Sequence, residues 1–195
     1  KKPKATAKRS RTQKKIDRLL MMARHIELHE GDLDAAAAEY RAVLKLDRKH
    51  FPARLALADI ARRKGDHAGA AKELYKLVKS HATSVPAWLA VAQTETQLGH
   101  HDKAQAAFSK VLKLEPTHAM AHLKLAQALH KRWQAGEKTV QVDLLRHLRA
   151  YLANASQTGT PAHRLAGRLV AEIEGGEIGV VVHDAKSAWS SPSVW

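Results

Sequence analysis

Histidines are the residues of this chain whose number and spacing could support chemistry. The 195 residues include thirteen of them. His25 and His29 are four residues apart, as are His118 and His122, and this spacing places two side chains on one helix face. His100 and His101 are adjacent. A zinc site needs three or four ligands converging at about 2 Å, and the sequence offers neither an HExxH pattern nor a cysteine. We therefore interpret these histidines as surface or hydrogen-bonded side chains, and we expect no metal and no cofactor.

Motifs of the common enzyme classes are absent from the sequence. It contains no G-x-S-x-G elbow, no glycine-rich phosphate loop and no Rossmann fingerprint. Gly175, Gly176 and Gly179 follow a predicted helix, not a strand, so we interpret this stretch as a linker. The lack of cysteine excludes disulfides and thiol chemistry. We expect a protein that is not an enzyme and has no small-molecule substrate.

A period of 34 residues organises the chain. Gly31, Gly65 and Gly99 are 34 residues apart. Four other sets recur at the same interval: Ala36, Ala70 and Ala104; Leu55, Leu89 and Leu123; Ala58, Ala92 and Ala126; and Pro52 and Pro86. Several registers that share one period are typical of a repeat protein, whose function is usually to bind other molecules.

The elements of this repeat are predicted to be helices. Ile16 opens an apolar stripe at helical spacing that ends at Gly31. Asp32 and Asp66 are suitable N-caps, and Pro52 suits the first turn of a helix. The predicted helices span residues 16–30, 33–46, 52–64, 67–79, 86–98, 102–114, 119–134, about 138–154, and 161–174.

Residues 85–118 resemble a tetratricopeptide repeat. The family pattern W-x2-L-G-x2-Y, A-x3-F and P is matched by these residues: Trp88, Val91, Ala92, Glu95, Ala104, Phe108 and Pro116. Other repeats depart from this pattern: Arg24 stands where a small residue is expected, and Ala82 stands in place of the closing proline. In the fourth repeat Trp133 replaces the turn glycine, which indicates a slightly lengthened turn around Gly136. The resemblance implies an all-α, right-handed superhelical solenoid of antiparallel helix pairs over residues 16–176. Its repeats would be about 17–50, 51–84, 85–118 and 119–154, followed by a capping helix at 160–174.

The resemblance also implies a binding groove, because the first helix of each pair lines the concave surface in this family. The side chains placed there are Met21, Met22, His25, Leu55, Asp59, Arg62, Arg63, Leu89, Gln93, Thr96, Gln97, Met120, Lys124, Gln127 and Lys131. This mixture of apolar, amide and basic groups suits a protein partner with an acidic or amphipathic segment. A Lys/Asn carboxylate clamp, which some members use for chaperone tails, has no match here beyond Lys124, so we do not expect that ligand.

A basic arm precedes the repeats. The formal net charge is +14, and residues 1–15 contain no acid and eight cations: Lys1, Lys2, Lys4, Lys8, Arg9, Arg11, Lys14 and Lys15. Such an arm would bind a polyanion such as RNA or DNA through its phosphates, an acidic protein, or an anionic lipid surface, or would serve only as a solubilising tail. It has no aromatic residue for base stacking. Protonation of histidines near about pH 6 would tighten any anionic partner.

The C-terminal tail, residues 177–195, differs in composition from the repeats. Ile178–Val182 could form a strand that adds to a partner's sheet, and Trp189 and Trp195 are of the type that anchors interfaces. The alternative is that the tail folds back on the last helix.

These observations favour a non-catalytic scaffold or adaptor that binds protein partners through its groove and termini within a larger assembly. The alternative is an RNA-binding accessory protein, for example on a ribosome, anchored by residues 1–15. No apolar run is long enough to span a membrane. We expect a cytoplasmic location, and export stays an alternative because the chain begins at Lys1 and a signal segment could precede it.

Overall fold

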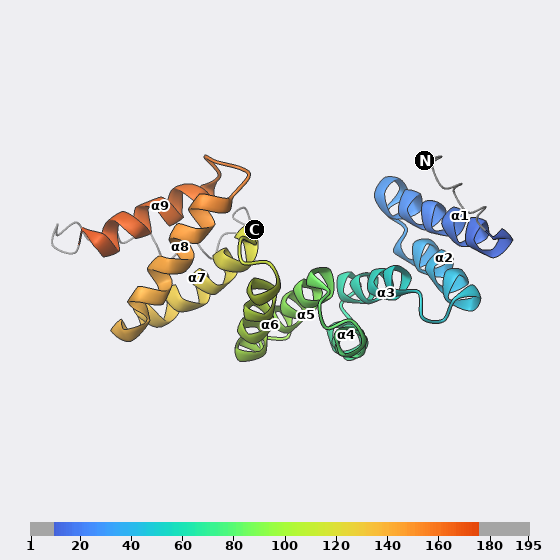
Figure 1. Ribbon diagram of the computed structural model, residues 1–195, viewed down its shortest axis with the longest axis horizontal. Helices are drawn as coiled ribbons and strands as arrows, with labels where there is room; N and C mark the ends of the chain where they lie inside the picture. Colours follow the sequence, from blue (N-terminus) through green and yellow to red (C-terminus); the bar gives the residue numbers. More distant parts are fainter. Residues whose placement is uncertain (1–9, 176–195) are drawn as a thin grey trace, which may run out of the picture. The chain divides into compact units, whose positions relative to one another are not determined.

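Residues 10–175 are described by the computed structural model, and every regular element in this range is a helix (Figure 1). The α-helices are α1 (Arg11–His25), α2 (Leu33–Leu46), α3 (Phe51–Arg63), α4 (His67–Ser80), α5 (Val85–Gln97), α6 (His101–Leu114), α7 (Ala119–Gln134), α8 (Gln141–Asn154) and α9 (Pro161–Glu174). A π-helical turn, η1 (Ile26–Glu30), extends α1, and a 3₁₀ turn, η2 (Lys138–Val140), precedes α8. The all-α fold class predicted from the repeat is confirmed. The predicted tail contacts lie outside the described residues.

The chain divides into two compact units within α5, between Ala90 and Val91. In the first unit α1 packs on α2, α2 on α3, and α3 on α4. In the second unit α6 packs on α7, α7 on α8, and α8 on α9. Packing of each helix on the next, through connections of a few residues, is the arrangement expected for consecutive helix pairs.

Alanines of the 34-residue period allow these helices to pack closely. Ala36, Ala58, Ala92, Ala104 and Ala126 are all buried. A methyl group at these positions lets neighbouring backbones approach while keeping good helix propensity. Each unit also has its own apolar core. The first includes Ile16, Tyr40, Val43 and Ile60, and the second includes Leu144, Leu148, Tyr151, Leu169 and Ile173.

The turn glycines end helices in the way the period predicts. Gly99 has a φ of 74°, in the left-handed region that other residues avoid. Its N–H donates to the Thr96 backbone carbonyl at 3.1 Å, and the His100 N–H donates to the Glu95 backbone carbonyl at 2.9 Å. This pair of bonds is the Schellman motif, and it satisfies carbonyls that the helix end leaves free. Gly136 follows α7 with a φ of 96°. The connection there, residues 135–137, is as long as the connections 64–66 and 98–100, so the prediction of a lengthened turn is wrong and the added residues lengthen α7 instead.

Helix α1 begins earlier than predicted, so the boundary of the basic arm at residue 15 is wrong. The Ser10 hydroxyl accepts a hydrogen bond from the Gln13 N–H at 3.1 Å and caps a helix that starts at Arg11. Lysine, arginine and glutamine are good helix formers, so the residues before Ile16 extend the helix by five residues. Three of the eight arm cations, Arg11, Lys14 and Lys15, therefore lie on α1, and the other five lie outside the described residues.

Two histidines act as N-caps. The Nδ1 atoms of His50 and His118 accept hydrogen bonds from the N–H groups of Ala53 and Ala121, at 3.3 Å and 3.2 Å. These bonds satisfy donors at the starts of α3 and α7. The interpretation of these two histidines as hydrogen-bonded structural side chains agrees with the structure.

Candidate functional site

The groove residues predicted on α3 carry charges that are already paired. The guanidinium of Arg62 donates to Asp59 Oδ1 at 2.5 Å, and Arg63 donates to Glu27 Oε1 at 2.5 Å. Leu55, on the same helix, is half-buried. The two arginines thus have less positive charge to offer an acidic partner than the sequence indicates.

Glu27 links three elements of the first unit. It pairs with Arg63 of α3 and accepts a hydrogen bond from the Tyr40 hydroxyl of α2 at 3.3 Å. Burial raises the pKa of Tyr40, and the negative charge of Glu27 raises it further. The carboxylate of Glu27 therefore holds η1 against α2 and α3, and we interpret its pair with Arg63 as structural.

The groove residues predicted on α1 are exposed. Met21 has 73% of its surface accessible and Met22 has 43%. The His25 ring lies 4.7 Å from that of His29, centre to centre. Leu89, the last candidate in the first unit, is half-buried on α5.

In the second unit the predicted residues lie on α5 and α7. Gln93, Thr96 and Gln97 are exposed on α5. The Thr96 hydroxyl donates to the Ala92 carbonyl at 2.8 Å, so this donor is already used within the helix.

Helix α7 carries a row of four predicted residues at intervals of four, three and four: Met120, Lys124, Gln127 and Lys131. This spacing places them on one helix face. Met120 and Lys131 are exposed, whereas Lys124 and Gln127 are half-buried. Burial lowers the pKa of Lys124 to about 8, because removal from water disfavours the charged ammonium. A partner carboxylate beside Lys124 would favour its charged form. We name these four residues the α7 row.

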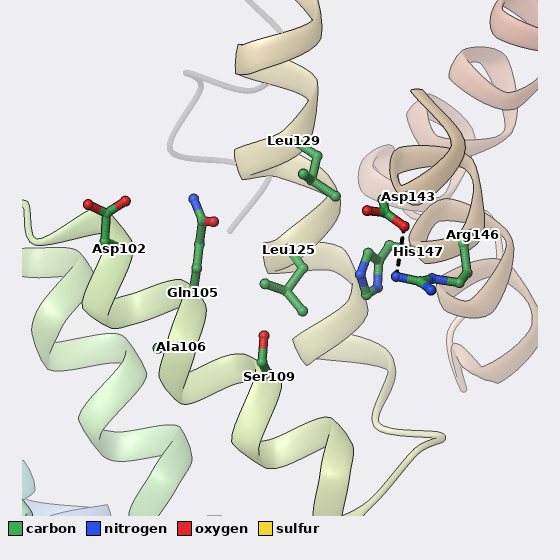
Figure 2. Close-up of a pocket in the computed structure, with 9 residues that line it drawn as sticks. All are labelled: Asp102, Gln105, Ala106, Ser109, Leu125, Leu129, Asp143, Arg146 and His147. Carbon is green, nitrogen blue, oxygen red and sulfur yellow. Dashed lines mark ion pairs between the residues drawn. The ribbon is translucent and has the colours of Figure 1, made fainter. Parts of the chain in front are cut away.

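A cavity that the sequence did not predict lies on the other side of α7 (Figure 2). It has a volume of about 420 Å³ and is lined by α6, α7 and α8 through Asp102, Gln105, Ala106, Ser109, Leu125, Leu129, Asp143, Arg146 and His147. Arg146 and Asp143 form an ion pair of 2.9 Å in its wall. With about 100° of rotation per residue, Leu125 and Leu129 point about 150° away from the α7 row. The cavity and the α7 row are therefore separate surfaces.

The first unit has an equivalent cavity between α2, α3 and α4. Its lining includes Leu57 and Ala61, which precede Leu125 and Leu129 by two periods of 34 residues. Arg54 and Glu73 pair in its wall at 3.4 Å. The recurrence of Leu57, Val91 and Leu125 was a signal in the sequence, whereas Glu95 stands between Ala61 and Leu129 in the second register. The family resemblance instead predicts binding at the concave surface, which other side chains of the first helices line.

His122 and His147 form a bond between α7 and α8. Their Nδ1 atoms are 2.8 Å apart, and His122 Nε2 lies 2.9 Å from the Pro116 carbonyl oxygen. A carbonyl only accepts, so Nε2 of His122 must carry a hydrogen, and neutral His122 then has an accepting Nδ1. His147 consequently donates from its own Nδ1. Burial, followed by the neighbouring His122 and Arg146, lowers the pKa of His147 to about 4. The pair thus links α7 and α8, with His147 as the donor and His122 as the acceptor.

The described residues, 10–175, contain neither a candidate metal centre nor a membrane-spanning helix. In residues 10–175 no group of three or more histidine, aspartate or glutamate side chains is arranged to hold a metal ion. Within the same range no helix has both the length and the apolar character needed to cross a bilayer. Trp189 and Trp195, the anchors predicted in the tail, lie outside the described residues.

Structures of tetratricopeptide repeat proteins resemble this fold. One from Parabacteroides merdae superposes with a TM-score of 0.65 at 17% identity, and covers 84% of this chain and 61% of its own. The thermophilic protein TTC0263 from Thermus thermophilus has a TM-score of 0.58 at 19% identity, with 83% and 82% covered. YrrB, described as a tetratricopeptide repeat protein with an unusual peptide-binding site, has a TM-score of 0.61 at 14% identity, with 86% and 84% covered. The chain thus spans less than two thirds of the Parabacteroides protein, and these identities support the fold alone.

Sequence comparison identifies the family. No curated protein sequence gives a significant match. Two family models do, each described as a tetratricopeptide repeat, over residues 25–85 and 85–128. The matched segments together cover more than half of the chain, and they coincide with the helix pairs, alanines and turn glycines described above. The chain belongs to the tetratricopeptide repeat family.

Proposed function

We propose that this chain is a non-catalytic scaffold that binds a protein partner through the first helices of its repeats, as a component of a larger assembly. Its fold is that of a protein-interaction scaffold, and one similar structure, YrrB, is described as having a peptide-binding site. The observation that supports the proposal most is the α7 row. There an exposed methionine, an amide and two lysines share one helix face.

The chemistry of the α7 row favours a partner segment with an acidic group beside an apolar one. Met120, with 48% of its surface exposed, offers a flexible apolar contact. Lys124 is a partly desolvated cation, so a carboxylate next to it gains more than it would beside a fully hydrated lysine. Arg62 and Arg63 contribute less, because Asp59 and Glu27 already compensate their charges. The two lysines of the α7 row, Lys124 and Lys131, are the groups that we assign to acid recognition.

The RNA-binding alternative receives no specific support from the described residues, and five of its eight cations lie outside them. It stays a prediction of the sequence and is tested by the nuclease arm of the experiment below.

The test compares two double variants of equal charge change. Lys124→Gln with Lys131→Gln alters the α7 row, and Lys110→Gln with Lys113→Gln alters exposed positions on α6. A partner is first captured with the tagged full chain, in parallel with and without nuclease treatment. The affinity of the captured partner for each purified variant is then measured. The α7 variant is expected to weaken binding by roughly tenfold or more, as for loss of a carboxylate pair, while the α6 variant binds like the wild type.

Two results would count against the proposal. One is equal affinity for the α7 variant and the wild type. The other is capture that disappears with nuclease, which would favour the RNA-binding alternative.

A further inference from the structure

One face of α1 and η1 combines cations with exposed apolar side chains. Five exposed residues of α1 follow one another at intervals of three and four, which places them along one side of the helix: Arg11, Lys14, Arg18, Met21 and His25. Leu28 is exposed on η1, the π-helical turn that continues α1. We call this stripe the outer face of α1. Lys15 and Met22 are exposed beside it. No exposed residue of α1 is acidic, because its single carboxylate, Asp17, is half-buried.

This arrangement is unfavourable for the chain alone. The first turn of α1 contains no acid, and Arg11 and Lys14 lie where the helix dipole is positive. Met21 and Leu28 expose 73% and 78% of their surfaces to water. A partner that is negatively charged and partly apolar would relieve both costs at once, and locally unfavourable features of this kind are expected at functional surfaces.

The nature of the face favours a lipid surface over other anionic partners. A nucleic acid would neutralise the cations but leave Met21, Met22 and Leu28 exposed, and residues 1–30 contain no Phe, Trp or Tyr for base stacking. Neither of the two cavities described above is lined by a residue of α1, so neither offers this face a hollow for a defined side chain of a protein. A bilayer needs no hollow, since its anionic headgroups lie directly above an apolar layer.

We propose that the outer face of α1 binds the surface of a membrane that contains anionic lipids. Arg11, Lys14 and Arg18 contact the phosphates, and Met21, Met22 and Leu28 enter the boundary between headgroups and acyl chains. The sequence places five more cations before Ser10, which add to the attraction. This assigns Met21, Met22 and His25, which the family resemblance places in the protein-binding groove, to a lipid partner, and leaves protein binding to the first helices of the later repeats, α3, α5 and α7. The proposal goes beyond protein binding at the α7 row, which it neither requires nor excludes.

Co-sedimentation of the full chain with vesicles tests this proposal. Phosphatidylcholine vesicles with and without phosphatidylglycerol are compared, and the expected result is binding only when phosphatidylglycerol is present. Lys14→Gln with Arg18→Gln is expected to lower the partition coefficient by roughly 30-fold, at about fivefold for each cation. Met21→Ser with Leu28→Ser is expected to lower it by roughly tenfold at unchanged charge.

Matched controls distinguish this face from general attraction between a basic protein and an acidic vesicle. Lys110→Gln with Lys113→Gln has the same charge change on α6, and Val142→Ser replaces an apolar side chain on α8 that is 76% exposed. Both controls should bind as the wild type does, and circular dichroism verifies that each variant is folded. The proposal is overturned if the controls lose as much binding as the α1 variants, if Met21→Ser with Leu28→Ser has no effect, or if vesicles do not bind at all.

Discussion

Replacement of Leu148 by alanine is expected to lower the free energy of unfolding of the second unit by about 2–5 kcal/mol. Leu148 is fully buried on α8, in the core formed with Leu144, Tyr151 and Leu169. The substitution removes three buried carbon atoms and leaves a space that two packed helices fill only in part. Urea unfolding followed by circular dichroism measures the loss.

Val142→Ala is the control for this experiment, because it shortens an exposed side chain of the same helix. Its effect should stay within about 0.5 kcal/mol. Similar losses for Leu148→Ala and Val142→Ala would mean that α8 does not bury the face described here.

Acidification from about pH 7 to about pH 4.5 is expected to destabilise the second unit through His147. Its side chain titrates near 6.5 in the unfolded chain, whereas burial and the neighbouring His122 and Arg146 lower the folded pKa to about 4. Between these values the unfolded chain binds more protons, so stability falls as the pH falls. The cost is about 1–2 kcal/mol after allowance for partial solvent screening.

His147→Gln isolates this effect. A glutamine amide can donate to His122 Nδ1 but does not titrate, so the variant should lose less stability between these pH values than the wild type. His130, whose pKa is also lowered by burial, and the acidic groups around the cavity, Asp102 and Asp143, are the same in both proteins. His101→Gln, at an exposed position on α6, is the control. An unchanged pH dependence in His147→Gln would contradict the assignment.

Helix boundaries could be predicted from the sequence because they depend on local physics. Asp32 caps α2 and Gly99 ends α5 through bonds to residues a few positions away, and both are visible as residue types at fixed spacing. The predicted start of α1 is wrong because a run of cations is typical of a disordered tail. The start at Arg11 depends on the Ser10 hydroxyl, which accepts a hydrogen bond from the Gln13 N–H.

The character of the candidate surfaces could be predicted only in part. The family pattern predicted which residues line a groove, and of those on α7 Met120 and Lys131 are exposed whereas Lys124 and Gln127 are half-buried. Arg63 and Glu27 are 36 residues apart, and His122 and His147 are 25 apart, so their pairing depends on how the helices pack. Asp59 and Arg62 are three residues apart on one helix, so their ion pair can be predicted from the sequence.

Site-specific photocrosslinking to the captured partner tests most directly which face of the second unit binds protein. A photoreactive phenylalanine derivative is introduced either at Met120, on the α7 row, or at Ser109, an exposed residue that lines the cavity on the opposite side of α7. We predict that the partner crosslinks from position 120 and not from position 109. Crosslinking from position 109 alone would contradict the account and move the binding surface to the cavity between α6, α7 and α8.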